Sequence, residues 1–106
     1  MTDQPQVPAN DNDDMYMYRL RLFVTGATPN STRAILNLKG LCETYLKGKY
    51  ELEIVDVYQQ PLIAESEQII ALPMLIKKSP LPQRRLIGDM SDTDKVLKGL
   101  NISATE

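Results

Sequence analysis

The fold of this protein is decided by residues 18–58, which read YRLRLFVTGATPNSTRAILNLKGLCETYLKGKYELEIVDVY. In residues 18–25, polar and apolar side chains first alternate and then become continuously apolar, which predicts a strand buried more deeply at one end. Gly26 breaks this pattern. Thr28 then supplies a capping hydroxyl, and Pro29 suits the first helical position because its missing N–H costs no hydrogen bond there. A helix is therefore expected to begin at Pro29.

The predicted helix carries one apolar stripe. Its apolar side chains recur at the 3.6-residue period of a single helix face, and they are Ala34, Ile35, Leu38, Leu41, Cys42, Tyr45 and Leu46. We expect the helix to stop at Gly48, because glycine favours the conformation that ends helices. Residues 50–58 begin by alternating apolar and acidic side chains, which predicts a second strand. A strand, a crossover helix and a strand form a right-handed unit with parallel strands.

The second half predicts a short helix, two strands and a last helix. Residues 59–70 indicate the short helix, and residues 74–76 a third strand. The prolines within 79–82 turn the chain, so that residues 83–87 form a fourth, antiparallel strand. Residues 91–94 are a helix start with acidic side chains in the first turn. The expected apolar positions of the two helices are Leu62, Ile63, Ile69, Ile70, Val96, Leu97 and Leu100. The predicted fold class is α/β, with the order βαβαββα of the thioredoxin-like fold.

The length of 106 residues allows one hydrophobic core and is too short for two domains. Residues 1–15 hold four aspartates and two prolines with almost no large apolar side chain, so we expect a disordered acidic extension. We assign residues 16–102 to the single domain and residues 103–106 to a short C-terminal tail. No apolar run is long enough to span a bilayer and no signal peptide is evident, which predicts a cytoplasmic location.

The residue types needed for common catalytic and metal sites are scarce. The chain contains no histidine and one cysteine, so we expect no metal, no cofactor and no enzymatic activity. Thioredoxin-like enzymes carry two cysteines where the first helix begins, whereas residues 28–31 read Thr-Pro-Asn-Ser. Cys42 lies on the apolar stripe and is expected to be buried and inert. The alternative, a thioredoxin-like redox or transferase protein, requires a reactive Cys42.

Charge also limits the class of partner. Outside residues 1–15 the chain has 12 basic and 10 acidic side chains, without the clustered bases that nucleic acid or an acidic membrane requires. Two basic pairs, Lys77-Lys78 and Arg84-Arg85, lie on the predicted hairpin. They could meet an acidic partner or form solvated strand faces with edge protection, and both interpretations stay open.

Five motifs point to a family. They are LFVTG at 22–26, TPNS at 28–31, VDV at 55–57, ALP at 71–73 and the long, unusual PLPQRRLIGDMSD at 80–92. Together they resemble the KaiB family of bacterial circadian clock proteins. The resemblance implies a non-enzymatic regulator that docks on the ATPase ring of KaiC, and in complete clocks also acts on KaiA and competes with a sensor kinase. A free-standing sensor module, resembling the KaiB-like domain of a clock histidine kinase, is the remaining alternative.

The resemblance further implies two folds, a tetrameric ground-state fold and a monomeric thioredoxin-like fold that binds KaiC. Such metamorphic behaviour requires two packings within a few kcal/mol of each other. By position, the resemblance assigns fold-switching roles to five residues, namely Pro73, Pro80, Pro82, Gly99 and Asn101. A homotetramer or dimer is implied only in this way.

The partner-facing surface implied by the resemblance includes the second strand and the nearby helix. There Glu51, Glu53 and Gln68 replace an alanine and two lysines, a change that would reverse the local charge and can reject a partner. We therefore expect a KaiC-like ATPase as partner, with binding to a standard clock partner weakened or redirected and KaiA a doubtful partner. Arg84 and Arg85 complete the candidate partner-binding residues.

Overall fold

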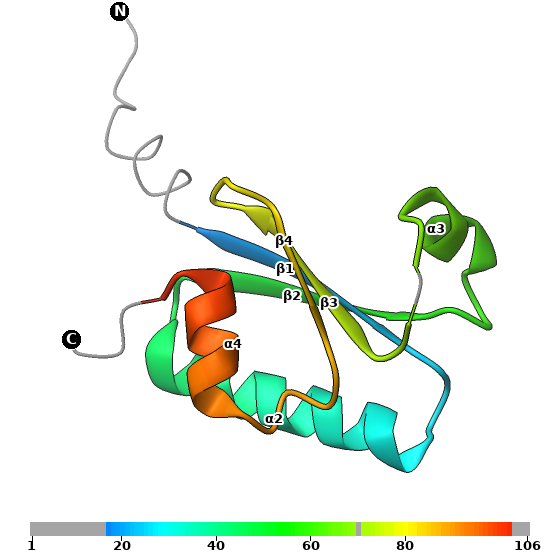
Figure 1. The fold of residues 1–106 in the computed structure, drawn as a ribbon, viewed down its shortest axis with the longest axis horizontal. Helices are drawn as coiled ribbons and strands as arrows, with labels where there is room; N and C mark the ends of the chain where they lie inside the picture. Colours follow the sequence, from blue (N-terminus) through cyan, green and yellow to red (C-terminus); the bar gives the residue numbers. More distant parts are fainter. Residues whose placement is uncertain (1–16, 70, 103–106) are drawn as a thin grey trace, which may run out of the picture.

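The computed structural model describes residues 17–69 and 71–102, and it contains the predicted βαβαββα order (Figure 1). The strands are β1 Tyr18–Val24, β2 Tyr50–Asp56, β3 Met74–Ser79 and β4 Arg84–Ile87, and the helices are α2 Pro29–Tyr45, α3 Pro61–Ser66 and α4 Thr93–Leu100. The sheet has the order β2-β1-β3-β4, with β1 parallel to β2 and antiparallel to β3. The predicted extension 1–15, the tail 103–106 and Ile70 lie outside the described residues.

Two helices begin as their capping residues predict. The side chain of Thr28 accepts a hydrogen bond from the Ser31 amide, and Asp92 accepts one from the Lys95 amide at 3.1 Å. α2 ends at Tyr45, earlier than expected, and Gly48 instead takes its left-handed conformation in the turn to β2. Local capping chemistry therefore fixes where these helices begin.

Besides the end of α2, three predicted boundaries are wrong. α3 ends at Ser66 instead of about residue 70, because the chain turns through a left-handed residue, Gln68, with φ 56°. β2 ends at Asp56, whose carboxylate accepts a hydrogen bond from the Tyr58 amide at 2.9 Å and starts a turn. β3 continues to Ser79 instead of ending at residue 76. The longer β3 carries the predicted basic pair at 77–78 into the sheet.

The longer β3 separates the two lysines of that pair. Lys77 is 1% exposed, and its ammonium donates to the carbonyl of Leu100 at 3.2 Å and lies 5.9 Å from the ring centre of Tyr18. Burial, together with the nearby Arg84 charge, lowers the pKa of Lys77. The interpretation of Lys77 as a solvated or partner-facing base is therefore wrong, since this residue holds the end of α4 against the sheet.

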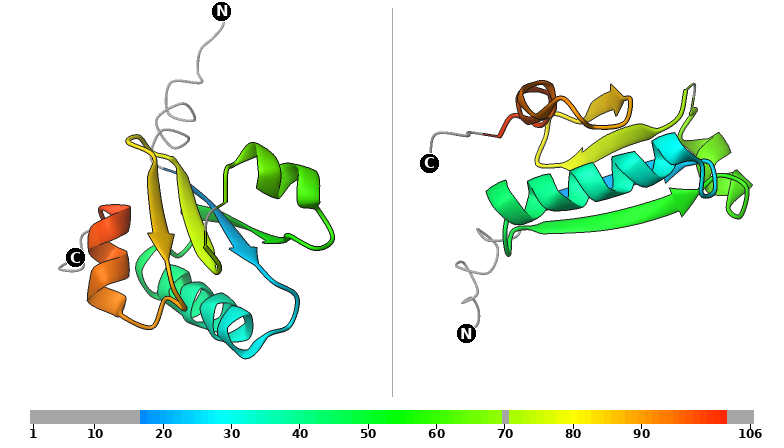
Figure 2. Two further views of the ribbon diagram at one scale, coloured as in Figure 1. Left: turned by 45° about the vertical axis from the view of Figure 1, so that its right-hand side comes forward. Right: turned by 90° about the horizontal axis from the view of Figure 1, so that it is seen from below.

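The sheet has two differently covered faces (Figure 2). On the helix-covered face, α2 and α4 bury a large apolar cluster that includes the side chains of Leu22, Leu38 and Leu100. The opposite α3 face has a smaller cluster, and its four buried residues are Phe23, Val55, Met74 and Ile76. Because strand side chains alternate, Leu22 and its neighbour Phe23 serve the two different faces. The rest of the α3 face is charged.

Candidate functional site

A ladder of opposite charges crosses the α3 face between β1 and β2. In the parallel register Arg19 lies opposite Glu51 and Arg21 opposite Glu53, and the side chains form ion pairs at 3.1 Å and 2.8 Å. The two glutamates remain half-exposed. The glutamates expected to reverse the charge of the surface thus each balance an arginine of the same chain.

Glu67, which the sequence analysis missed, lies at the centre of this face. Its carboxylate contacts cations from three strands: Arg21 of β1 at 3.3 Å, Lys78 of β3, and Arg85 of β4 at 3.9 Å. Only 14% of its side chain is exposed. Glu67 follows the last residue of α3, so this contact fixes the end of α3 to the sheet. The pairing joins distant segments, and no local sequence signal indicates it.

The predicted partner-binding residues fall into two groups. Glu53 shares Arg21 with Glu67. Arg85 contacts Glu67, and its guanidinium also reaches the backbone carbonyl of Gln68 at 3.5 Å. Glu51 adjoins them through the ladder. Arg84, by contrast, pairs in register with the buried Lys77 and alternates to the other face of the sheet. The structure therefore brings together four of the five predicted residues.

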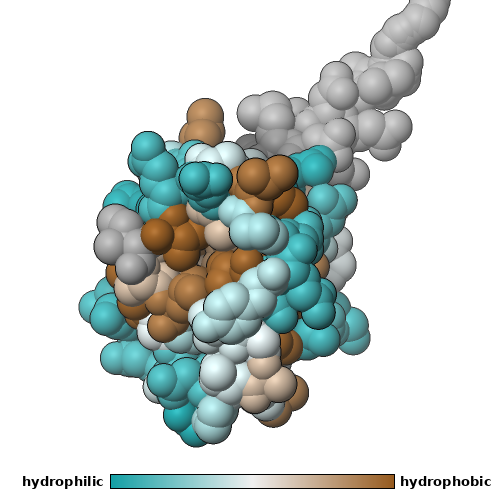
Figure 3. Space-filling model, turned by 90° about the vertical axis from the view of Figure 1, so that its right-hand side faces the viewer, coloured by the Kyte–Doolittle hydropathy of each residue, from teal (hydrophilic) through white to brown (hydrophobic). Residues whose placement is uncertain are grey.

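An apolar patch adjoins the charged network (Figure 3). A shallow groove beside α3 is lined by Val57, Ala64, Glu65, Gln68, Ile69 and Leu72. Nearby, Tyr58 and Leu62 are 77% and 78% exposed. An apolar centre bordered by charged and polar side chains is the composition of many protein-docking surfaces.

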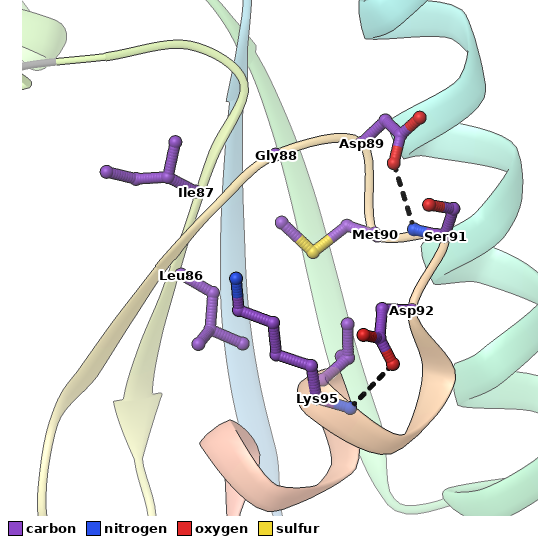
Figure 4. Close-up of a pocket in the computed structure, with 9 residues that line it drawn as sticks. Leu86, Ile87, Gly88, Asp89, Met90, Ser91, Asp92 and Lys95 are labelled. Atoms are coloured by element: carbon purple, nitrogen blue, oxygen red, sulfur yellow. Dashed lines mark hydrogen bonds between the residues drawn. The ribbon is translucent and has the colours of Figure 1, made fainter.

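The long motif at 80–92 ends in a hydrogen-bonded connection from β4 to α4 (Figure 4). The Asp89 carboxylate accepts a hydrogen bond from the backbone amide of Ser91 at 3.1 Å, and the Asp89 backbone carbonyl accepts one from the side-chain amide of Asn37 at 2.9 Å. Hydrogen bonding to Ser91 lowers the pKa of Asp89. The next residue, Met90, is buried with a φ of 62°. These contacts anchor the connection on α2.

The residues assigned to fold switching occupy turns and a close helix contact. The peptide bonds before Pro73, Pro80 and Pro82 are all cis. Gly99 lies inside α4, where an added Cβ would overlap the end of the Leu86 side chain. Asn101 ends α4 in the left-handed conformation. The structure holds one arrangement, and the alternative ground-state fold stays a prediction.

The entrance to α2 and the single thiol do not resemble a redox site. The Thr28 hydroxyl donates to the buried hydroxyl of Ser31 at 2.8 Å, so both side chains serve the helix cap. Cys42 is buried, and its pKa is raised to about 12, mainly by burial and to a smaller extent by the Glu43 charge.

Within residues 17–69 and 71–102, no group of three potential ligands could hold a metal ion. None of the described helices is long and apolar enough to cross a membrane.

This chain is similar to known proteins over most of its length. Residues 21–102 match the family described as KaiB domain. The circadian clock oscillator protein KaiB of a Picosynechococcus strain is 51% identical over 80% of this chain and 82% of that protein. The KaiB of Synechococcus elongatus is 49% identical over 80% of this chain and 83% of its own length.

Solved structures confirm the thioredoxin-like fold. The N-terminal domain of Synechococcus elongatus SasA has a TM-score of 0.70 and 23% identity, covering 95% of this chain and 93% of that domain. Mitochondrial thioredoxin 3 from Saccharomyces cerevisiae has a TM-score of 0.66 and 16% identity, covering 90% of this chain and 87% of that protein. At these identities the likeness shows the fold alone.

Proposed function

The chain belongs to the KaiB family, and we propose that it is a non-enzymatic regulator that docks on a KaiC-like ATPase. The observation that carries the proposal is the extent of the family match, which includes β2, the end of α3 and β4. These elements contribute Glu51, Glu53, Glu67 and Arg85 to the charged network. The circuit it serves is a circadian, timing or stress-response one.

The α3 face suits such a docking role physically. It combines an apolar groove, which gains free energy when water leaves it, with charges that orient a partner. Glu51 and Glu53 are half-exposed and paired with arginines, so a partner's lysine or arginine can compete for them. A partner whose surface is acidic at this point meets two carboxylates instead. We therefore expect weaker or altered binding to a standard clock KaiC.

The test is to mix the purified protein with the KaiC homologue of its own source and ATP. Size-exclusion chromatography with light scattering after hours of incubation should reveal a co-migrating complex, and the free protein on the same column reveals any tetramer or dimer. Absence of a complex after long incubation would mean that the family fold serves another partner.

A charge variant tests whether Glu53 itself influences binding. Glu53→Lys should strengthen binding to a standard clock KaiC, while Asp94→Lys makes the same change of charge in α4, on the other face of the sheet. Equal effects of the two variants would show that only net charge matters. Full-strength binding of the unaltered protein to that partner would contradict the proposed influence of Glu51 and Glu53.

The redox alternative depends on Cys42 and has its own discriminating experiment. Burial and the raised pKa keep this thiol protonated and shielded at neutral pH. We expect iodoacetamide to alkylate the native protein at least about 100-fold more slowly than the urea-unfolded protein, because reaction requires opening of the core. Alkylation of native protein at the rate of the unfolded chain would restore the redox interpretation.

A further inference from the structure

The adjacent basic residues Arg84 and Arg85 lie in β4, which forms one edge of the sheet (Figure 1). From the sequence alone, this pair could meet an acidic partner or protect the edge. An edge strand presents backbone N–H and C=O groups that can pair with another chain, and charged side chains often prevent such pairing. The direction of these backbone groups and of the two arginines decides between the two interpretations.

The hydrogen bonds of β4 show which backbone groups face outward. The Gly88 amide donates to the Pro73 carbonyl at 3.0 Å, and this bond continues the antiparallel register of β3 and β4. Residues that bond across an antiparallel pair alternate along each strand, so the N–H and C=O groups of Arg85 and Ile87 point away from β3. Within residues 17–69 and 71–102, no hydrogen bond reaches these four groups.

The arginine side chains do not cover the outward groups. Successive side chains of a strand stand on opposite faces of the sheet, so the two arginines lie above and below its plane. The Arg85 guanidinium reaches the Gln68 carbonyl at 3.5 Å and the Met74 sulfur at 3.7 Å, which draws it inward over β3. The Ile87 side chain beside the edge is 54% exposed. The described residues therefore leave this edge open to another strand.

The side chains of β4 form a simple chemical pattern. Two cations, Arg84 and Arg85, precede two apolar residues, Leu86 and Ile87, so each face of the sheet carries one arginine and one apolar side chain. Within the described part of the chain, Arg84 forms no ion pair, and Arg85 has one, with Glu67 at 3.9 Å. An antiparallel strand that complements this pattern reads apolar, apolar, acidic, acidic.

A hollow beside β4 offers space for one apolar side chain of an added strand. Its apolar lining comes from Leu86, Met90 and Val96, between β4 and the start of α4 (Figure 4). The carboxylates at its rim, Asp89 and Asp92, each accept a backbone amide of this chain. The hollow thus lies at the apolar end of β4, and the acidic end of an added strand lies away from these aspartates.

We propose that the β4 edge binds an extended acidic segment of another protein by strand addition. The segment runs antiparallel to β4 and carries the pattern apolar, apolar, acidic, acidic. Main-chain hydrogen bonds to Arg85 and Ile87 supply affinity, and the alternating side chains supply specificity. The antiparallel direction is favoured because its ladder is the more stable one per residue. A second copy of this chain is disfavoured, since β4 against β4 gathers four arginines.

The experiment titrates the isotope-labelled full chain with a blocked, unstructured peptide that contains Val-Val-Glu-Glu. In titrations to about 1 mM peptide, the amide proton NMR signals of Arg85 and Ile87 should move downfield to saturation, because these groups gain hydrogen bonds. The Leu86 amide already faces β3 and should move less. The signals of β2, at the other edge of the sheet, should not move.

Two N-methylated peptides form a matched pair for this titration. In the antiparallel register, the amide of the first glutamate faces the Arg85 carbonyl and the amide of the second glutamate faces away. Methylation of the first should weaken binding at least about 10-fold, whereas methylation of the second should change it less than about 2-fold. Both peptides have the same composition and charge, and neither requires a variant of the protein.

Protein variants test the same contacts from the other side. Ile87→Pro removes an outward N–H without breaking a bond to β3, and should weaken binding about 10-fold. Arg84→Gln should weaken binding about 3-fold through the loss of one charge contact. The control is Lys39→Gln, which makes the same change of charge on the exposed side of α2 and should leave binding unchanged.

Four results would overturn the proposal. One is the absence of saturable shifts, and another is an equal effect of the two methylations, which shows attraction by charge alone. Tighter binding of a peptide with the reversed order, Glu-Glu-Val-Val, would show a parallel strand. Movement of the same signals on concentrating the protein without peptide would show that a second copy binds. No KaiC-like partner is used, so failure here leaves the proposed function intact.

Discussion

The two faces of the sheet use side chains in opposite ways. The helix-covered face carries a continuous apolar cluster beneath α2 and α4. The α3 face carries a smaller apolar cluster, and an ion network occupies the rest of that face. Burial of apolar surface stabilises by about 25 cal/mol per Å², while exposed ion pairs contribute about 0 to 1 kcal/mol each. Packing on the helix-covered face therefore supplies most of the stability, and the α3 face remains available for recognition.

The largest expected effect tests this division directly. Leu38→Ala opens a cavity in the fully buried cluster and should lower the free energy of unfolding by about 3 kcal/mol. Ile63→Ala on α3 removes a side chain that is only partly buried and should cost about 1 kcal/mol. Urea denaturation of both variants measures the difference. Equal losses would contradict the assignment of stability to the helix-covered face.

The contribution of the α3-face ion network to stability should depend mainly on one residue, Glu67. Glu67→Gln leaves Arg21, Lys78 and Arg85 without their shared carboxylate, and we expect a loss of about 2 kcal/mol, between the values for exposed and buried pairs. The matched control is Glu51→Gln, which breaks an exposed pair and should change stability by less than about 0.5 kcal/mol. If urea denaturation gives similar values for both, Glu67 is not the centre of the network.

The contact between α4 and β4 allows a further test of packing on the helix-covered face. Alanine is favoured over glycine inside a helix by about 1 kcal/mol, but a Cβ at Gly99 meets the Leu86 side chain. Gly99→Ala should therefore stabilise by about 1 kcal/mol in a Leu86→Ala background and by less in the unaltered chain. A double-mutant cycle measures this coupling. Identical effects in both backgrounds would show that the contact is absent.

The smallest expected effect concerns Lys77, a charged side chain buried under the helix-covered face. Burial lowers the pKa of Lys77 below the ordinary 10.5, so between these values the unfolded chain binds more protons than the folded one. The stability of the unaltered protein should consequently rise with pH through that window, relative to a Lys77→Met variant. Denaturation midpoints from pH 8 to 10.5 measure this difference. A gap between the two proteins that does not change with pH would mean that Lys77 is not desolvated.

Lys77 and Lys78 show where prediction from the sequence alone fails in β3. The alternation of β3 places them on opposite sides, but the strand was predicted to end before them, and two adjacent lysines suggested solvent. Polar residues at a strand end carry little periodic signal, and only the contact with α4 decides that one of them is buried. Glu67 was missed for a related reason, since its three cations come from strands distant in sequence.

The sequence alone determined the element order, the capped starts of α2 and α4, the parallel β1–β2 pair and the burial of Cys42. These features follow from local periodicity and capping, and so a single stretch of chain specifies them. Only the tertiary structure decided that Glu51 and Glu53 meet arginines and that Gln68 turns the chain. Charge pairing across strands depends on register and on which face each side chain occupies, and that becomes fixed only when the sheet is assembled.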